Sequence, residues 1–409
     1  MSQSVVPEAG LRICYVGATS PWPPRTGGHL RTIANLESLA SLGAVRFLLC
    51  TPQPQPPVIL PAAGGPDVRV FPVARPRANR RAWEWTRAVM SGQHPYLLRA
   101  RDAGVIGRVI GEVARFRADV VVLEFPFYPG VATAFRATGA FVVADAADDR
   151  LGVALGLLRV VPSLAMPRLF AEALVLARSE RRLSELDQVW YAAPEEAQRA
   201  AHLAPGRVRV VPNVVDVASI VVRAQRAPAY PRSAVFLGSF GYQPNVRAAI
   251  RFATTIGAEI RRLDPDARLA IVGRGPTRAI ISAARAGEVD VLADVPDAVV
   301  EISRYGVLVV PLGVAGGTRL KILEAFAAGV PVVATAVAAA GLGARNGVEF
   351  LAAERDADIA RATVALWDDR PRADRIREAA HRLVRDRYDL QSAHRAVREA
   401  LAERRPRAR

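Results

Sequence analysis

The sequence is poor in the residues that mark several classes of protein. Two cysteines among 409 residues are too few for a disulfide framework, and apolar neighbours predict that Cys14 and Cys50 are buried small hydrophobes in a reducing cytosol. No stretch approaches the ~18 uninterrupted apolar residues of a membrane span, and the first residues lack a signal peptide's charged and apolar regions. We therefore expect a cytoplasmic protein without a disulfide scaffold or a membrane span.

Lysine is almost absent, because Lys321 is the only one among 55 basic residues. The formal charge of +16 is thus carried by arginines distributed along the whole chain, which indicates a compositional bias and predicts no nucleic-acid partner. Two basic clusters, at 75–81 and 403–409, have two interpretations. They are a solvated loop and tail, or they attract the anionic inner face of a membrane as a peripheral contact.

The few histidines show no metal-ligand spacing, so we expect no metal and no other cofactor. Hydrophobic residues make up 51% of the chain and charged residues 23%, which is typical of a folded soluble protein. A length of 409 residues predicts two or three domains.

Buried strands alternate with helical patterns along the chain. The apolar run 11–17 ends at a glycine, a helical pattern follows from Leu30, and 44–50 is strand-like again, which is a βαβ unit. A second series begins at 233. The fold class predicted is α/β, with two Rossmann-like parallel sheets whose strands carry ligand at their carboxyl ends, facing a central cleft.

The densest group of functional residues lies between Val307 and Gly343. A buried strand runs into Gly316-Gly317 and then into a helix, with Arg319 and Lys321 at its start. Glycines allow close approach of the backbone, and free N–H groups at a helix start favour phosphate. This segment therefore predicts a diphosphate site.

Lys321 and Glu324 are three residues apart and share a helix face. A carboxylate there is placed to accept hydrogen bonds from two ribose hydroxyls. A solvated salt bridge worth about 0.3 kcal/mol is an equal alternative from the spacing alone. The retention of a lone lysine in an arginine-rich chain favours the binding site.

The stretch PLGVAGGTRLKILEAFAAGVPVVAT, together with FLGSFGYQPNVRAAIRF, LAIVGRGP and RVVPNVVD, resembles glycosyltransferases of the GT-B type, in particular the retaining Glu-x7-Glu group called family four. The resemblance covers nearly the whole chain. It implies an acceptor-side domain at 1–215, a nucleotide-sugar donor domain at 216–385, and a helix and basic tail at 386–409 that cross back to the first domain. It also implies catalysis without a metal.

The resemblance assigns roles to single residues. Glu324 matches the second motif glutamate, which holds the donor ribose, whereas the first falls at Gly316 and is missing. The chain has a Gly-Gly-Thr-Arg-Leu-Lys variant instead, in which Arg319 and Lys321 are the catalytic candidates that stabilise the diphosphate. The remaining donor-binding candidates are Gly316, Gly317, Thr318, Gly238, Arg274, Gly27 and Gly28.

The acceptor side departs further from the family. Relatives often carry Asp-x-His-Asn-x-Glu after the strand at 141–145, and the histidine position is Ala147 here. No general acid or base is assigned, and the leaving phosphate is expected to accept the acceptor's proton. The acceptor-side candidates are His29, Glu124, Tyr128, Asp145 and Asp148.

The function expected is transfer of a hexosyl-type sugar from a nucleotide-diphosphate sugar to a glycan, lipid or small metabolite. The alternative is a catalytically degenerate GT-B protein that binds nucleotide sugar as an auxiliary partner, which Gly316 and Ala147 keep open. A GT-B epimerase is a third option. The anionic partner that the positive charge suggests is, in each case, a diphosphate.

Overall fold

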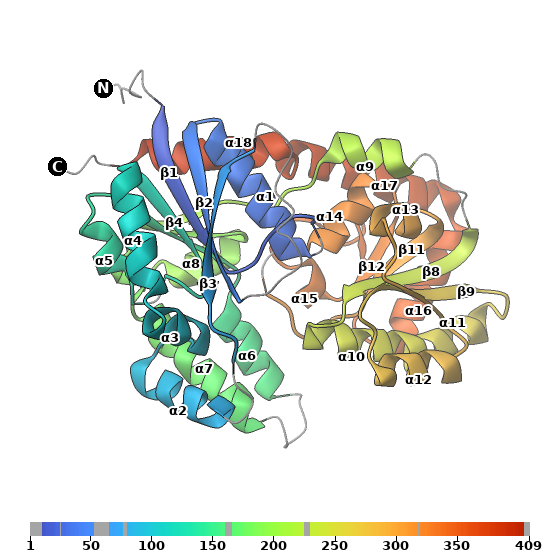
Figure 1. The fold of residues 1–409 in the computed structure, drawn as a ribbon. Coiled ribbons are helices and arrows are strands. Elements are labelled where there is room, and N and C mark those ends of the chain that lie inside the picture. The colour runs from blue at the N-terminus through green and yellow to red at the C-terminus, as the bar shows by residue number, and fades with distance from the viewer. Residues whose placement is uncertain are drawn as a thin grey trace. The chain divides into compact units, whose positions relative to one another are not determined.

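The chain is divided into two compact units, Met1–Pro212 with Ala393–Arg409, and Asn213–Ser392 (Figure 1). The structure is a computed structural model that describes residues 10–24, 26–52, 65–76, 80–128, 130–159, 166–224, 230–316 and 319–404. Each unit is built around its own parallel sheet.

The first unit has a seven-stranded parallel sheet in the order β3-β2-β1-β4-β5-β6-β7. Apolar runs form these strands because both faces of the sheet are covered by helices. The strands are β1 (Leu11–Gly17), β2 (Gly43–Pro52), β3 (Asp67–Val73), β4 (Val120–Glu124), β5 (Phe141–Ala147), β6 (Gln188–Tyr191) and β7 (Val208–Val210).

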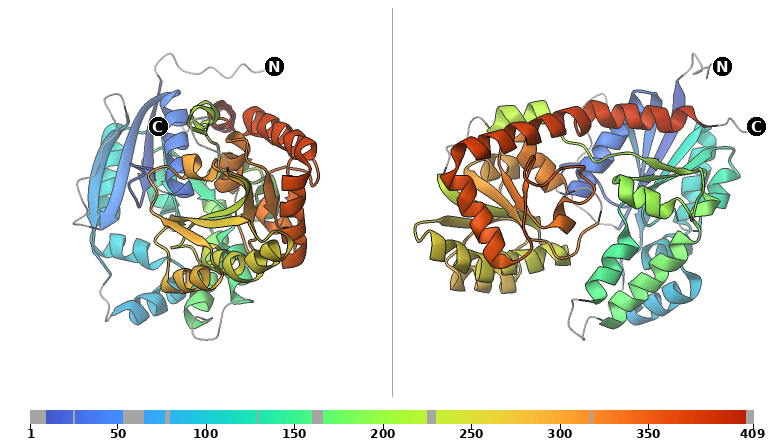
Figure 2. Two further views of the ribbon diagram at one scale, coloured as in Figure 1. Left: turned by 90° about the vertical axis from the view of Figure 1, so that its right-hand side faces the viewer. Right: turned by 180° about the vertical axis from the view of Figure 1, so that it is seen from behind.

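Helices cover the first sheet on two sides, and each side has its own apolar core. Val397, Ala400 and Leu401 of the last helix are buried in one of these cores, and Figure 2 shows that red helix ending over the first sheet. The helices are α1 (Gly27–Ala40), α2 (Arg81–Ser91), α3 (Pro95–Asp102), α4 (Val105–Phe116), α5 (Ala132–Arg136), α6 (Arg150–Leu158), α7 (Met166–Glu180), the 3₁₀ turn η3 (Leu183–Glu185), α8 (Pro194–Ala200) and α18 (Leu390–Ala402).

The second unit has a six-stranded parallel sheet in the order β10-β9-β8-β11-β12-β13. The strands are β8 (Tyr230–Ser239), β9 (Arg268–Arg274), β10 (Asp290–Ala293), β11 (Tyr305–Val310), β12 (Val332–Ala334) and β13 (Leu351–Ala352). The helices are α9 (Val217–Ala224), α10 (Gln243–Arg251), the π-turn η4 (Phe252–Ile256), α11 (Gly257–Leu263), α12 (Arg278–Ala286), α13 (Ala298–Ile302), α14 (Leu320–Ala327), α15 (Ala336–Ala339), α16 (Asp356–Asp368) and α17 (Arg370–Arg387).

The strand order reverses once in each sheet. In the first unit the chain builds outward from β1 to β3 and then returns to place β4 on the other side of β1. In the second unit the same reversal lies between β8 and β11. Open α/β sheets bind ligands outside the carboxyl ends of the strands at such reversals. The predicted α/β fold with two Rossmann-like parallel sheets is confirmed, and each sheet has one reversal at which to look for a site.

None of the helices in the described part of the chain is both long enough and apolar enough to cross a bilayer.

Candidate functional site

At the reversal in the second sheet, the segments that follow β8 and β11 meet through a hydrogen bond. The Lys321 ammonium, in the first turn of α14, donates to the Asn245 side-chain oxygen at 2.8 Å. Asn245 lies in the first turn of α10, is buried, and donates its own amide to the Ser239 carbonyl at 2.9 Å. One buried amide thus ties the end of β8 to the start of α14.

Two glycines at this point of the second sheet allow neighbouring atoms to approach the backbone closely. A Cβ on Gly238 would lie 3.1 Å from Asn245, so a side chain there would displace the amide that holds Lys321. A Cβ on Gly273, which pairs with Gly238 in the next strand, would lie 1.9 Å from the Gly238 carbonyl oxygen. Gly238, selected from the sequence as a donor-binding residue, therefore makes room for a protein amide.

Lys321 is partly buried in an environment that disfavours its charge. Its Nζ lies 4.7 Å from the centre of the Phe236 ring, an aromatic face that attracts a cation. Burial and, to a smaller extent, the Arg319 guanidinium nevertheless lower the pKa of Lys321 to about 7, against the opposing effect of Glu324. Lys321 is thus poised to gain a proton when an anion arrives.

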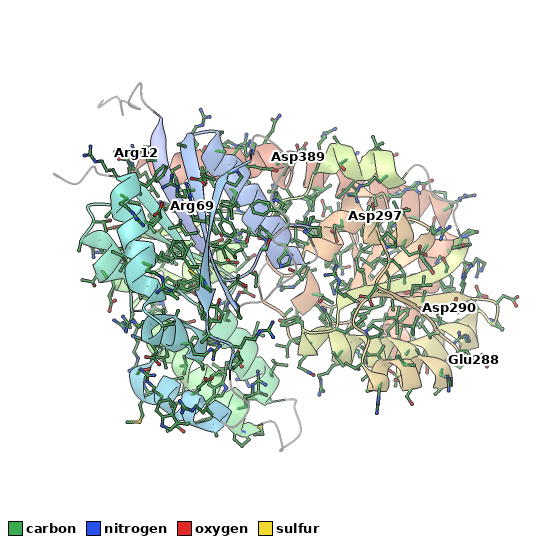
Figure 3. All side chains as sticks on the ribbon, in the orientation of Figure 1. Arg12, Arg69, Glu288, Asp290, Asp297 and Asp389 are labelled. Atoms are coloured by element: carbon green, nitrogen blue, oxygen red, sulfur yellow. The ribbon has the colours of Figure 1, made fainter. Side chains whose placement is uncertain are left out.

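Glu324 lies one turn further along α14, as its spacing from Lys321 predicts. Burial raises the pKa of Glu324 to about 7, and the positive charges of Arg223 and Lys321 oppose that rise. Arg223 on α9 pairs at 2.7 Å with Asp297, which also caps the start of α13 and is labelled in Figure 3. A carboxyl group whose pKa lies near 7 can form hydrogen bonds with hydroxyl groups.

Arg319 immediately precedes α14 and is buried. Its guanidinium donates to the Gly316 carbonyl and, at 3.2 Å, to the Val337 carbonyl, so it holds together the two loops beside the helix start. Gly317 and Thr318, two further donor-binding candidates, lie outside the described residues. Arg274 lies at the exposed end of β9, 4.0 Å from Asp294.

In the first unit, the paired glycines open α1 at the end of the loop that follows β1. Gly27 and Gly28 are exposed, and the Thr26 hydroxyl caps the helix by accepting from the His29 backbone N–H at 3.3 Å. The N–H groups of the two glycines therefore lie at an open helix start, where an anion is favoured. The His29 side chain is half-buried.

Asp145, an acceptor-side candidate, is instead the centre of a buried polar cluster. Its Oδ1 accepts from Arg31 Nη2 at 2.6 Å and Nε at 2.9 Å, while Oδ2 accepts from Asn35 at 2.8 Å and Tyr15 at 2.9 Å. Arg31 also donates to the Val211 carbonyl at 2.8 Å. With 2% of its surface exposed, Asp145 on β5 connects α1 to β1, and both of its carboxylate oxygens accept hydrogen bonds from the protein.

Glu124 ends β4, next to β1 at the strand-order reversal of the first sheet. A Cβ on Gly17 would lie 2.8 Å from Glu124 Oε2, so glycine is needed at the end of β1. The carboxyl accepts from the Ala18 backbone N–H, and its Oε1 accepts from the Thr32 hydroxyl at 3.4 Å, whereas Oε2 is buried and makes no hydrogen bond of normal geometry. Burial and then the Asp145 charge raise the pKa of Glu124 to about 7. A buried carboxylate oxygen without a good hydrogen bond is uncommon in a folded protein, and it marks Glu124 as a candidate for a role beyond packing.

The other acceptor-side candidates lie around Phe125. Tyr128 is buried with its ring centre 5.8 Å from that of Phe125, and burial raises the pKa of its phenol. Asp148 pairs at 3.4 Å with Arg150, whose guanidinium lies 4.3 Å from the Phe125 ring centre. Ala147 has a φ of 62°, a strained conformation for a residue with a Cβ. The structure therefore joins Asp148 to Arg150 and leaves Tyr128 in the core.

Comparison with known proteins places this geometry in a known architecture. Residues 231–369 match the family model of the glycosyl transferases group 1. Sucrose-phosphate synthase from Thermosynechococcus elongatus superposes with a TM-score of 0.71 at 16% identity, covering 96% of this chain and 98% of that chain. HepE of Anabaena, in complex with UDP and glucose, has a TM-score of 0.66 at 12% identity, covering 96% of this chain and 100% of that one.

A structure described as trehalose-6-phosphate from E. coli bound with UDP-2-fluoro glucose gives a TM-score of 0.68 at 13% identity, covering 97% of this chain and 100% of that chain. The chain has the GT-B fold. No curated protein sequence matches it. The GT-B fold and the group 1 match within the second unit together support a glycosyltransferase.

The GT-B fold brings together some of the residues that the sequence singled out. Lys321 and Glu324 lie together on α14. Arg319 instead donates hydrogen bonds to backbone carbonyls, and Asp145 is buried. Sequence reasoning missed Asn245, for which the signal is a polar residue one position after a proline at a helix start. It also missed Arg31 and Arg223. Among the described residues no group of His, Cys, Asp and Glu side chains is placed to hold a metal ion.

Proposed function

We propose that this protein transfers a hexosyl group from a nucleoside-diphosphate sugar to a hydroxyl acceptor, without a metal ion and with retention of the anomeric configuration. The observation that carries the proposal is the Lys321–Asn245 hydrogen bond at the strand-order reversal of the second sheet. It fixes the lone lysine where an α/β sheet binds nucleotides, inside the segment that matches the group 1 glycosyl transferases.

The donor's diphosphate is held at the start of α14. Lys321 supplies a cation there, and the N–H groups of the first helical turn supply further donors. Arg319 adds positive charge and holds the adjoining loops in place through the Gly316 and Val337 carbonyls. Glu324, one turn along, accepts hydrogen bonds from the two ribose hydroxyls. A UDP-sugar is the first donor to test, because the related structures named above contain UDP or a UDP-sugar.

In the reaction, the bond between the sugar's anomeric carbon and the diphosphate oxygen breaks, and the acceptor oxygen forms a new bond to the same carbon. The acceptor hydroxyl's proton passes to the departing diphosphate, so no protein base is needed. Lys321 and the α14 N–H groups stabilise the negative charge that develops on the leaving group, which lowers the barrier.

We place the acceptor hydroxyl at Glu124 in the first unit. Its Oε2 is buried and makes no hydrogen bond of normal geometry, and a hydroxyl group would supply one. The carboxylate is tethered through Oε1 to Thr32, so it presents Oε2 in one orientation. Glu124 orients the acceptor in this scheme and takes no proton from it.

The experiment begins with a thermal-shift panel of nucleotide sugars that differ in base and sugar. A donor present at 100 times its dissociation constant adds about 2.7 kcal/mol of apparent stability. The stabilising donor is then incubated with the protein and an excess of chelator, and the anomeric proton of the product is followed by NMR. Retained configuration with chelator present supports the proposal, whereas inversion or dependence on an added divalent metal contradicts it.

One observation favours a second candidate function. Gly316 carries no carboxylate where the family motif has its first glutamate, so a nucleotide-sugar-binding protein without transfer activity is the alternative. Tight binding of a donor, with no hydrolysis and no transfer to any acceptor tried, would favour it.

A further inference from the structure

Four helices of the first unit form a separate helical bundle beyond the carboxyl ends of its strands. α2 follows β3, and α6 follows β5; Figure 1 shows them gathered with α3 and α7 below the sheet. Ala88, Leu98 and Val175 form one small core between α2, α3 and α7. Ala154, Ala173 and Leu176 form another between α6 and α7. We call residues 80–103, 150–159 and 166–182 the helical bundle.

The bundle exposes large apolar side chains that its two cores do not use. Phe170 keeps 64% of its surface exposed and Met90 keeps 81%. The complete set of such residues in the bundle is Trp83, Met90, Leu155, Met166 and Phe170.

These apolar residues form stripes along single helices. Trp83 and Met90 are seven residues apart on α2, and Met166 and Phe170 are four apart on α7, so each pair lies on one side of its helix. Among the described residues, every exposed tryptophan, phenylalanine and methionine belongs to the bundle.

Positive charge is concentrated in the same helices. The helical bundle contains eleven arginines and four acidic residues, a net charge of +7 out of the chain's +16, although Arg150 and Arg182 pair with Asp148 and Glu185 just outside it. Exposed arginines lie on the same helices, with Arg159 at the end of α6 and Arg168 within the first turn of α7. The Arg87 guanidinium lies 5.6 Å from the Trp83 ring centre. Two arginine-rich segments that are separate in the sequence thus come together in the helical bundle.

We propose that the helical bundle docks on an anionic lipid bilayer. Exposed tryptophan, phenylalanine and leucine beside arginine is the combination that settles at the boundary between headgroups and acyl chains. The charge of +7 selects an anionic lipid surface over a neutral one and over a second copy of the same bundle, which would repel it. The proposal concerns binding alone and stands apart from sugar transfer.

Vesicle sedimentation tests the docking directly. The full chain is mixed with vesicles of equal parts phosphatidylglycerol and phosphatidylcholine, and with vesicles of phosphatidylcholine only. We expect binding to the anionic vesicles that weakens steeply when salt is added, because charge attraction is screened. Equal binding to both vesicle types, or no binding to either, would overturn the proposal.

Matched variants locate the surface. Arg159→Gln with Arg168→Gln is expected to weaken binding to anionic vesicles about 25-fold, since each surface arginine contributes about five-fold. Trp83→Ser with Phe170→Ser is expected to weaken it at least as much. The controls on the second unit, Arg285→Gln with Arg375→Gln and Leu263→Ser with Ile281→Ser, also remove exposed residues and should bind as the wild type does. Equal losses in bundle and control variants would contradict the location.

A site-specific label keeps the test independent of any loss of folding. Cys14 and Cys50 are fully buried, so a thiol-reactive, polarity-sensitive fluorophore attaches only to an introduced cysteine. Anionic vesicles should shift the emission of the label at Phe170→Cys to the blue and leave that at Ile281→Cys unchanged. An unchanged spectrum at both positions, or self-association in ultracentrifugation that Trp83→Ser with Phe170→Ser abolishes, would overturn the proposal.

Discussion

Lys321 and Asn245 lie 76 residues apart in the chain and are joined by a hydrogen bond of 2.8 Å. Asn245 has no charge, so it orients the Lys321 ammonium without neutralising it. The amide's other end is fixed by the Ser239 carbonyl, and the Phe236 ring limits where Nζ can lie. The lysine is therefore held in one place before any nucleotide arrives, which reduces the entropy lost on binding.

Removing this cation should weaken nucleotide binding. Lys321→Ala is expected to lower the affinity for the nucleoside diphosphate about 10- to 100-fold, since hydrogen bonds to charged groups contribute ~1.5–3 kcal/mol. Asn245→Ala keeps the charge and loses only its orientation, so its effect should be smaller. Isothermal titration calorimetry measures both, with the exposed Arg285→Ala on α12 as control. Equal affinity for the wild type and Lys321→Ala would contradict the assigned role.

Nucleotide binding should also take up a proton. Because burial and Arg319 lower the pKa of Lys321 to about 7, this amine is mostly neutral at pH 8 in the free protein. A diphosphate beside it favours the charged form and raises that pKa, so the complex gains close to one proton. Calorimetry at pH 8 in buffers of different ionisation enthalpy counts the protons. The Lys321→Ala variant should take up correspondingly less, and identical counts would exclude Lys321 as the acceptor of the proton.

Glu124 should make the protein less stable as pH rises from about 4.5 to 7. The pKa of this carboxyl is about 7 in the folded state against its ordinary value of 4.5, so within that window only the folded state holds the proton. Glu124→Gln cannot ionise and should flatten the decline by on the order of 1–3 kcal/mol. Urea unfolding at pH 5 and pH 8 measures the difference.

The exposed Glu399→Gln on α18 is the matched control for that substitution and should keep the wild-type pH slope. A slope in Glu124→Gln as steep as that of the wild type would show that this carboxyl is not the buried group that titrates.

The buried pair of Arg31 and Asp145 should be essential to the first unit. Asp145→Ala leaves the Arg31 guanidinium buried without its carboxylate, and breaking a buried ion pair in this way costs ~3–5 kcal/mol. Asp374→Ala removes half of a pair with Arg377 that is exposed on α17, for which ~0–1 kcal/mol is expected. Urea midpoints measure both. A loss at Asp145 no larger than at Asp374 would mean that the cluster is not structural.

Local patterns in the sequence predicted the fold well. The apolar run that ends at Gly17 forms β1, and Lys321 and Glu324 share one face of α14 because their spacing matches the helical period. The sequence did not predict which side chains, distant along the chain, pair with one another in the fold. Asp145 was expected on the acceptor side because of its carboxylate. That carboxylate instead accepts hydrogen bonds from Arg31, which lies 114 residues earlier in the chain.

The positions of polar side chains at the two strand-order reversals were only partly predicted. Glu124 ends one buried strand and Lys321 lies in the first turn of the helix that comes after another, a pattern that local sequence displays. Asn245 became significant only once the sheet order placed β8 beside β11. The local signal, a polar residue one position after a proline at a helix start, does not by itself distinguish an amide that orients a lysine from one that faces solvent.

The most direct test is the turnover of the donor that stabilises the protein, measured as release of nucleoside diphosphate by the wild type, by Lys321→Ala and by Arg285→Ala. Transfer chemistry at the start of α14 predicts turnover by the wild type and by Arg285→Ala, and a loss of at least 100-fold in Lys321→Ala, since an electrostatic stabiliser of a developing charge contributes ~2.7–4 kcal/mol. Tight binding of the donor by the wild type, without any release of nucleoside diphosphate, would contradict it.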